Sequence, residues 1–162
     1  MSLAFTLDIL RKENIKVTVI GVTGSKGKST TTALINAILE KSGKKFHLAG
    51  NIRGVANLPL LKKIEDGDII LAELDSWQLQ GFHSLKISPN IALFTNFFED
   101  HLNYYGGSMR KYFHDKSAIF SYQNENDTLI MTHESKLAIA DYIKKPLISK
   151  KIVAAFGKKL QS

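Results

Sequence analysis

The sequence predicts an α/β fold of three layers, in which a mostly parallel sheet is flanked by helices. The first observation is a set of short, continuous runs of apolar or β-branched residues, which suit strands buried on both faces. The second is a set of longer amphipathic segments between these runs, and the third is a glycine-rich loop that directly follows the first run. The predicted strands are residues 17–20, 69–72, 91–94 and 129–131, with residues 46–48 and 152–156 as further candidates.

Three amphipathic segments predict the helices. The predicted apolar face of segment 29–41 comprises Leu34, Ile35, Ile38 and Leu39, and a Ser-Gly pair follows as a plausible stop. Segment 109–122 follows Ser108, a residue type that caps helix N-termini well. Segment 134–143 is a shorter third helix. Strands that alternate with helices imply βαβ units and therefore a parallel sheet.

Composition predicts one globular domain over residues 1–162. The hydrophobic fraction of 44% and the charged fraction of 23% are ordinary for such a domain. No apolar run approaches the roughly 20 residues that span a bilayer, and the N-terminus lacks a basic segment followed by a long apolar one. The chain has no cysteine, which excludes disulfides and thiolate metal sites. We expect a cytoplasmic protein without membrane insertion.

The formal net charge of +7 raises two functional possibilities, namely nucleic-acid binding and attraction of phosphorylated small molecules. The lysines are scattered along the chain, as on an ordinary solvated surface. The densest stretch, residues 144–159, lacks both the interleaved aromatic residues and the arginines that nucleic-acid contacts favour. We therefore predict no nucleic-acid partner.

The glycine-rich loop after residues 17–20 predicts a phosphate-binding loop of the P-loop NTPase type. Glycines allow backbone N–H groups to converge on phosphate oxygens, and the following helix adds its positive N-terminus. Lys28 can reach the β- and γ-phosphates of ATP, and the hydroxyl of Ser29 can bind Mg²⁺. Val22 stands where the general pattern has its first glycine. The predicted ATP-binding residues are Thr23, Gly24, Ser25, Lys26, Gly27, Lys28, Ser29 and Thr30.

Together with three later segments, this variant loop resembles the Mur ligases and their relatives, the folylpolyglutamate synthases. The segments are Ala-Gly-Asn-Ile at 49–52, Leu-Ala-Glu-Leu-Asp-Ser-Trp-Gln-Leu-Gln at 71–80, Thr-Asn-Phe-Phe-Glu-Asp-His-Leu-Asn-Tyr-Tyr at 95–105 and Tyr-Phe-His-Asp-Lys at 112–116. They occur in the family order, and segment 71–80 is most similar to the D-glutamate-adding members. The chain departs from the family pattern at Arg53, Asp75, Trp77, Gln80 and Asn103.

The resemblance implies an ATP-dependent ligase of peptidoglycan precursor synthesis. In that chemistry ATP forms an acyl phosphate on UDP-N-acetylmuramoyl-L-alanine, and the amine of D-glutamate attacks it. The chain would be the N-terminal part of the central ATP-binding domain, with the sugar-nucleotide and C-terminal domains absent. We therefore expect a monomer that does not ligate on its own.

The resemblance also implies roles for single residues. Glu73, at the end of the predicted strand 69–72, would join Ser29 as a ligand of Mg²⁺. His101 would serve a second Mg²⁺, and Lys116 would carry a carbamate that helps to position the metal. Lys28, Lys116 and His101 are then the catalytic candidates, and Asn51, Asp75 and Ser76 are the candidates for substrate contact. We expect Trp77 to have a packing role rather than a chemical one.

Other interpretations remain open at this point. Glu73 could be an ordinary acid at a strand end, His101 a surface histidine and Lys116 a solvated lysine. A folylpolyglutamate-synthase-like ligase is a second enzyme candidate, although segment 77–79 suits it less well. A non-catalytic P-loop nucleotide-binding module is a third. The short chain favours it, and the combination of Lys28, Ser29, Glu73 and His101 disfavours it.

Overall fold

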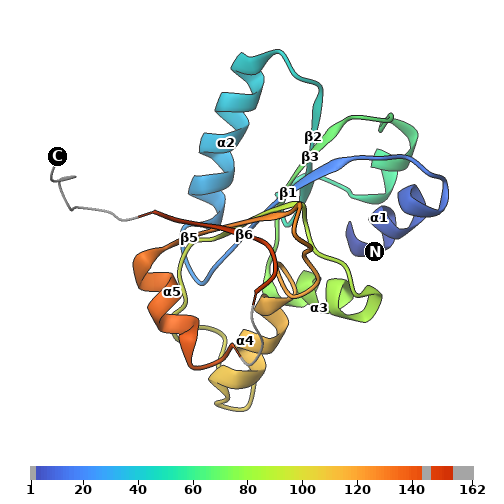
Figure 1. The fold of residues 1–162 in the computed structure, drawn as a ribbon. Coiled ribbons are helices and arrows are strands. Elements are labelled where there is room, and N and C mark those ends of the chain that lie inside the picture. The colour runs from blue at the N-terminus through green and yellow to red at the C-terminus, as the bar shows by residue number, and fades with distance from the viewer. Residues whose placement is uncertain (1–2, 144–146, 155–162) are drawn as a thin grey trace, which may run out of the picture.

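A computed structural model describes residues 3–143 and 147–154 of the chain, which form an α/β fold with a six-stranded, entirely parallel sheet (Figure 1). The strand order is β2-β3-β1-β4-β5-β6. The strands are β1 (Thr18–Thr23), β2 (Phe46–Gly50), β3 (Ile69–Glu73), β4 (Ile91–Phe94), β5 (Thr128–Thr132) and β6 (Lys150–Ala154). All six predicted strands are present, and residues 155–156 of the last prediction lie outside the described residues.

Helices lie on both faces of this sheet and give the predicted three layers. In the described part of the chain α2 covers one face, while α3, α4 and α5 lie on the other face (Figure 1). The short helix α1 packs against α3 and against the 3₁₀ helix η1. The helices are α1 (Leu3–Lys12), α2 (Lys28–Ser42), η1 (Leu58–Lys62), α3 (Ser76–Leu85), α4 (Met109–Ser117) and α5 (His133–Ala140).

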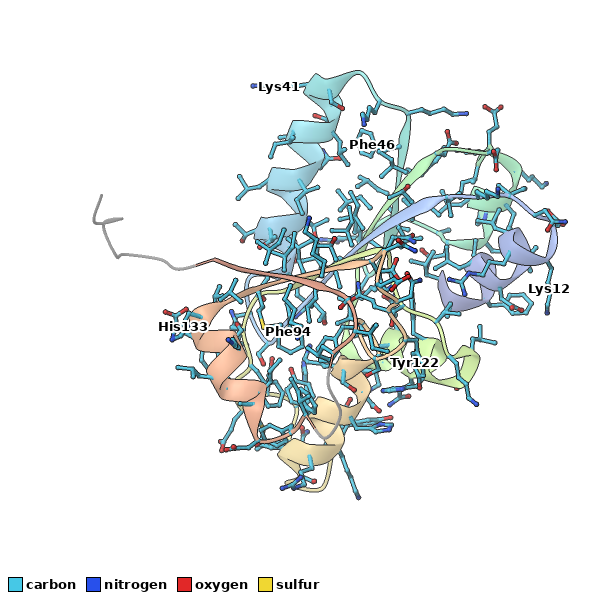
Figure 2. All side chains as sticks on the ribbon, viewed as in Figure 1. Lys12, Lys41, Phe46, Phe94, Tyr122 and His133 are labelled. Atoms are coloured by element: carbon cyan, nitrogen blue, oxygen red, sulfur yellow. The ribbon has the colours of Figure 1, made fainter. Side chains whose placement is uncertain are left out.

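The larger hydrophobic core lies between the sheet and the face that carries α3, α4 and α5. It joins side chains that point to this side of the strands with the apolar faces of these helices and of α1. Phe94 of β4 is 1% exposed and points into this crowded layer (Figure 2). The core fixes α3 and α4 relative to the ends of the central strands, which is where the candidate site lies.

The opposite face of the sheet is only partly covered, and here one prediction is wrong. Leu39 of α2 is buried against Val22 and Leu71, but Leu34 and Ile38 are 63% and 66% exposed. The helix meets the sheet along a narrower stripe than the sequence predicted, because its main contacts with the sheet are with β1 and β3 at the centre. The apolar face of α2 is therefore partly open.

Two helices are shorter in the structure than predicted. The predicted helix 109–122 ends at Ser117, after which i→i+3 hydrogen bonds tighten the chain so that the three consecutive residues 118–120 are all buried. The predicted helix 134–143 ends at Ala140. Ser108 caps α4 as predicted, because its hydroxyl accepts a hydrogen bond from the backbone N–H of Lys111.

Two helices, α1 and α3, were not among the predicted elements. In α1 the apolar spacing of Leu3, Leu7 and Leu10 was a usable signal, since all three side chains are buried on one face. In α3 the signal was Asp75, whose carboxylate caps the helix by accepting the N–H of Gln78 at 2.7 Å.

The topology brings three loops together at one edge of the sheet. Strands β3, β1 and β4 are neighbours, and Val22 pairs with Glu73 while Thr23 pairs with Phe94. All three strands run in the same direction, so the chain leaves each of them at the same edge. The loop after β1, the start of α3 and the loop after β4 are therefore adjacent.

Candidate functional site

Residues 23–29, called here the glycine loop, join β1 to α2. Gly27 is the N-cap of α2 with φ 81°, and Gly24 has φ 148°. A Cβ atom at Gly24 would lie 1.9 Å from the hydroxyl oxygen of Thr95, so the backbone of the loop passes too close to its neighbour for any larger residue. Both glycines therefore adopt the positive φ angles that a phosphate-binding loop uses, and Gly24 also leaves room for the neighbouring Thr95.

The glycine loop is held from one side by Thr95 and Asn96, the two residues after β4. The backbone N–H of Lys26 donates to Oδ1 of Asn96 at 2.8 Å, and the hydroxyl of Thr95 donates to the carbonyl of Lys26 at 2.7 Å. The N–H of Ser25 donates to the carbonyl of Asn96 at 3.0 Å. Neither residue was predicted to have a role, although polar residues directly after a buried parallel strand are a recognisable signal.

The side chains of Ser25 and Thr23 anchor the glycine loop to neighbouring backbone carbonyls. The hydroxyl of Ser25 donates to the carbonyl of Phe98 at 2.9 Å and lies 3.3 Å from the hydroxyl of Tyr112. The hydroxyl of Thr23 donates to the carbonyl of Leu74 at 2.7 Å. Both side chains are buried, so they tie the loop to its neighbours rather than facing the open side.

The open side of the loop can attract an anion. The amides of Lys28, Ser29 and Thr30 lie in the first turn of α2, where backbone N–H groups have no carbonyl four residues earlier to bond with. The ammonium group of Lys28 folds back onto the loop and donates to the carbonyls of Gly24 and Ser25 at 3.0 and 3.1 Å. An N-terminal helix turn with a lysine beside it is an arrangement that suits phosphate groups.

Ser29 and Glu73 meet at the same edge. The hydroxyl of Ser29 donates to Oε1 of Glu73 at 3.1 Å, so two oxygen ligands of the kind that Mg²⁺ prefers already lie side by side. Glu73 is 6% exposed, and Asn51 lies next to it because the N–H of Asn51 donates to the carbonyl of Glu73 at 2.7 Å. The structure thus brings together three of the predicted site residues.

The side chain of Lys116 extends from α4 to the glycine loop. Its ammonium group donates to the carbonyl of Gly24 at 2.8 Å and lies 5.0 Å from the centre of the Tyr112 ring. The side chain is 1% exposed. Burial, followed by the nearby charge of Lys28, lowers the pKa of Lys116 to about 7, although Asp75 and Asp100 act in the opposite direction. The amine therefore loses its proton more readily than an ordinary lysine.

His101 lies on the loop after β4 and is exposed. It has φ 53°, an uncommon backbone conformation for a residue with a side chain, and its ring is 3.7 Å from the carboxylate of Asp100. Within the described residues no hydrogen bond or ion pair joins His101 to Glu73 or Lys116, and no cluster of three His, Cys, Asp or Glu side chains could hold a metal. Any Mg²⁺ here would need oxygen atoms from phosphates and water as well.

Asp75, Ser76 and Trp77 begin α3 beside the site. Asp75 is the N-cap of the helix, and Ser76 is 2% exposed. Trp77 is 41% exposed, and its indole packs against the rings of His101 and Tyr104. The preference of a large apolar residue for the core is overridden because α3 turns its buried face, with Leu79 and Phe82, toward the sheet and leaves Trp77 outside.

Comparison with known proteins establishes the family. A sequence model of the Mur ligase middle domain matches residues 22–161. The chain belongs to the Mur ligase family. It is 43% identical over 112 residues to the UDP-N-acetylmuramoylalanine–D-glutamate ligase of Oceanobacillus iheyensis, covering 69% of this chain and 24% of that enzyme. It is 36% identical over 128 residues to the enzyme of the same name from Chlorobium phaeobacteroides, covering 76% of this chain and 27% of the enzyme.

The fold is that of solved members and relatives of the Mur ligase family. The MurF ligase of Thermotoga maritima, solved in complex with ADP, superposes with a TM-score of 0.69 at 21% identity and covers 94% of this chain and 36% of its own. E. coli FolC, solved with DHPP and ADP, superposes with a TM-score of 0.62 at 18% identity and covers 92% of this chain and 45% of its own. The chain spans about a quarter of the length of the curated Mur ligases it matches.

Proposed function

We propose that this chain is the first part of the central ATP-binding domain of a D-glutamate-adding Mur ligase. The enzyme as a whole would join D-glutamate to UDP-N-acetylmuramoyl-L-alanine in the cytoplasm. The proposal rests on the arrangement at the N-terminus of α2. Lys28 and Ser29 begin this helix, and the hydroxyl of Ser29 contacts Glu73. The preceding loop passes so close to Thr95 that position 24 has no room for a side chain. The identity of 36–43% to enzymes named for this reaction supports the choice of substrate.

The described residues suit MgATP. The first-turn amides of α2 and Lys28 would hold the phosphates, and the oxygens of Ser29 and Glu73 would hold Mg²⁺. ATP, when bound, supplies the phosphoryl group that turns the substrate carboxylate into an acyl phosphate open to attack by the amine of D-glutamate. The protein's own share is to hold these groups in line and to neutralise negative charge.

Lys116 and His101 would complete the charge arrangement. A lysine that is neutral near pH 7 can react with CO₂ to give a carbamate, so the lowered pKa of Lys116 favours that role. His101 would contribute to a second Mg²⁺ together with oxygen atoms of phosphate and water. We expect Lys116 to remain unmodified in the chain without nucleotide, because its ammonium group is hydrogen-bonded to the carbonyl of Gly24.

Two rival functions have weaker support. A folylpolyglutamate-synthase-like ligase is favoured by the fold shared with E. coli FolC, but that likeness is at 18% identity. A non-catalytic nucleotide-binding module would keep the glycine loop without needing Lys116 buried beside it. Binding of UDP-N-acetylmuramoyl-L-alanine rather than a folate would decide against the first of these.

The role of Glu73 gives a direct test of the proposed metal site. Mg²⁺ should strengthen ADP binding to the natural chain, and Glu73→Gln should remove most of that gain while leaving metal-free binding unchanged, because only the charge of the oxygen ligand is lost. The matched control is Glu65→Gln, which changes an exposed acid paired with Lys45 away from the site. Calorimetric titration with and without Mg²⁺ measures both effects, and an equal Mg²⁺ gain in Glu73→Gln and Glu65→Gln would refute the assignment.

We also expect the chain alone to release phosphate only at background rate with ATP, UDP-N-acetylmuramoyl-L-alanine and D-glutamate. About three quarters of the length of the matched ligases has no counterpart here, so the substrates lack groups that would hold them in reactive geometry. A coupled phosphate assay measures this. Sustained turnover would show that the chain is more than a part of the nucleotide site.

A further inference from the structure

A cavity of about 560 Å³ lies against α4 and the chain that follows this helix. Its wall on α4 is formed by Arg110, Phe113, His114 and Ser117, whose spacing of three and four residues places them on one face of the helix. Lys116, which extends to the glycine loop, is on a different face of the same helix. The volume is that of a small-molecule site. We call this space the α4 cavity.

The α4 cavity and the glycine loop lie at opposite edges of the sheet. Gln123 lines the cavity, and its Nε2 donates to the carbonyls of Pro89 at 2.9 Å and Thr128 at 3.1 Å. Pro89 precedes β4 and Thr128 begins β5, whereas the glycine loop follows the end of β1. Because the strands are parallel, the cavity is at the edge where they begin. It is therefore separate from the proposed nucleotide site.

Aromatic rings form much of the apolar wall of the α4 cavity. The ring of Phe113 lies 5.1 Å from that of Tyr142 and 6.3 Å from that of Phe120, measured between ring centres. Tyr122 adds a further ring to the lining. Aromatic side chains offer a large apolar area and prefer tilted or offset contacts with other rings. The wall therefore suits a flat aromatic group.

Two stacked imidazoles extend this wall. The rings of His83 and His114 are 4.2 Å apart and nearly parallel, and both residues line the cavity. Nε2 of His83 faces the carbonyl of His114 and so carries the proton, which leaves Nδ1 to accept the hydroxyl of Tyr122 at 2.8 Å. Burial lowers the pKa of His83 below its ordinary value of 6.5. His83 thus adds a neutral, fixed ring.

Arg110 gives the cavity a permanent positive charge. Its guanidinium lies 5.7 Å from the centre of the Tyr142 ring, at the exposed side of α4. No Asp or Glu is in the described lining, and within residues 3–143 and 147–154 no carboxylate forms an ion pair with Arg110. A guanidinium binds a carboxylate through two parallel hydrogen bonds. The charge of the cavity therefore favours an anion.

We propose that the α4 cavity binds a flat aromatic carboxylate, with its ring among the aromatic side chains and its carboxylate on Arg110. The aromatic wall accounts for the ring, and the unpaired guanidinium accounts for the negative charge. A neutral aromatic compound would gain only the first of these contacts. The site is distinct from the nucleotide site and does not depend on the proposed ligase function.

The probe for this site is 4-(trifluoromethyl)phenylacetate, whose fluorine signal is followed by NMR as the chain is titrated. Binding should be saturable with a Kd on the order of 1 mM, as expected for so small a ligand. The matched amide has the same ring and no charge, and it should bind at least about fivefold more weakly. No binding of the acid up to about 5 mM, or equal binding of acid and amide, would overturn the proposal.

Variants locate the probe. Arg110→Gln should weaken binding of the acid at least about fivefold and leave binding of the amide unchanged, because only the contact to the carboxylate is lost. Lys111→Gln is the matched control, since it removes the same charge from the next residue, which is exposed and outside the cavity lining. Ser121→Phe places a ring in the cavity from its exposed side and should block the acid and the amide alike. Equal weakening in Arg110→Gln and Lys111→Gln, or full binding to Ser121→Phe, would contradict the inference.

Competition with ADP separates the α4 cavity from the glycine loop. Saturating ADP and Mg²⁺ should leave the fluorine titration of the acid unchanged, because the two sites lie at opposite edges of the sheet. Displacement of the acid by ADP would place the probe on the glycine loop and would overturn the proposal, while leaving the nucleotide assignment intact.

Discussion

At the scale of single residues, the buried amine of Lys116 links the glycine loop to the pH dependence of stability. In the unfolded chain the lysine has its ordinary pKa of 10.5, and in the folded chain burial lowers the pKa to about 7. Between these values the unfolded chain holds a proton that the folded chain has released. The contribution of Lys116 to the free energy of unfolding therefore rises with pH across this window, by at most about 1.4 kcal/mol per pH unit.

Lys116→Met tests this linkage, because methionine has a similar length and no proton to bind. The variant should be more stable than the natural chain at pH 6, and its advantage should shrink by about 4 kcal/mol by pH 10. Urea unfolding at several pH values measures the difference. Lys111→Met on the exposed side of α4 is the control and should leave the pH dependence unchanged. Parallel stability curves for Lys116→Met and the natural chain would show that the amine is not neutral in the folded state.

At the scale of one element, α2 carries an apolar face of which only part is covered. Leu39 is buried in the small cluster with Val22 and Leu71, whereas Leu34 and Ile38 are mostly exposed. The sheet beside it is open as well. Leu93 pairs with Ile130, and Ile130 pairs with Ile152, which is 47% exposed. Exposed apolar groups of this size favour association in solution.

The double substitution Leu34→Ser with Ile38→Ser should therefore reduce self-association and leave the free energy of unfolding within about 1 kcal/mol of the natural value. Light scattering and denaturant unfolding measure the two quantities. Leu39→Ala is the contrasting variant and should cost about 2–5 kcal/mol, because it empties a buried position. A stability loss in the double variant as large as that of Leu39→Ala would mean that the α2 face is covered in solution.

The elements also show what the sequence could and could not predict. The strands could be predicted because short continuous apolar runs are typical of strands buried on both faces of a parallel sheet. The glycine loop could be predicted because its backbone has positive φ angles at Gly24 and Gly27, which favour glycine. The extent of α2 burial was not predictable, since periodicity marks an apolar face but does not reveal how much of the sheet that face meets. The end of α4 depends on core packing of residues 118–120, which no local pattern specifies.

At the scale of the whole molecule, the parallel sheet explains why residues distant in sequence share one site. Glu73, Ser29 and Lys116 come from β3, α2 and α4, and all three contact the glycine loop or its immediate neighbours. The family resemblance predicted that these three residues share a site. The hydrogen bonds from Thr95 and Asn96 to the glycine loop were not predicted, because they depend on the backbone path after β4. None of the helices in the described ranges is long and apolar enough to cross a bilayer.

The central claim is that the glycine loop binds a nucleotide, and Lys28 tests it most directly. Calorimetric titration of the chain with ADP and Mg²⁺ should give saturable binding that Lys28→Ala weakens about tenfold or more, as the loss of a charge-assisted contact to phosphate predicts. Lys41→Ala is the matched control, since Lys41 extends into solvent from the far end of the same helix (Figure 2). Binding that is unchanged in Lys28→Ala, or weakened equally in both variants, would contradict the account.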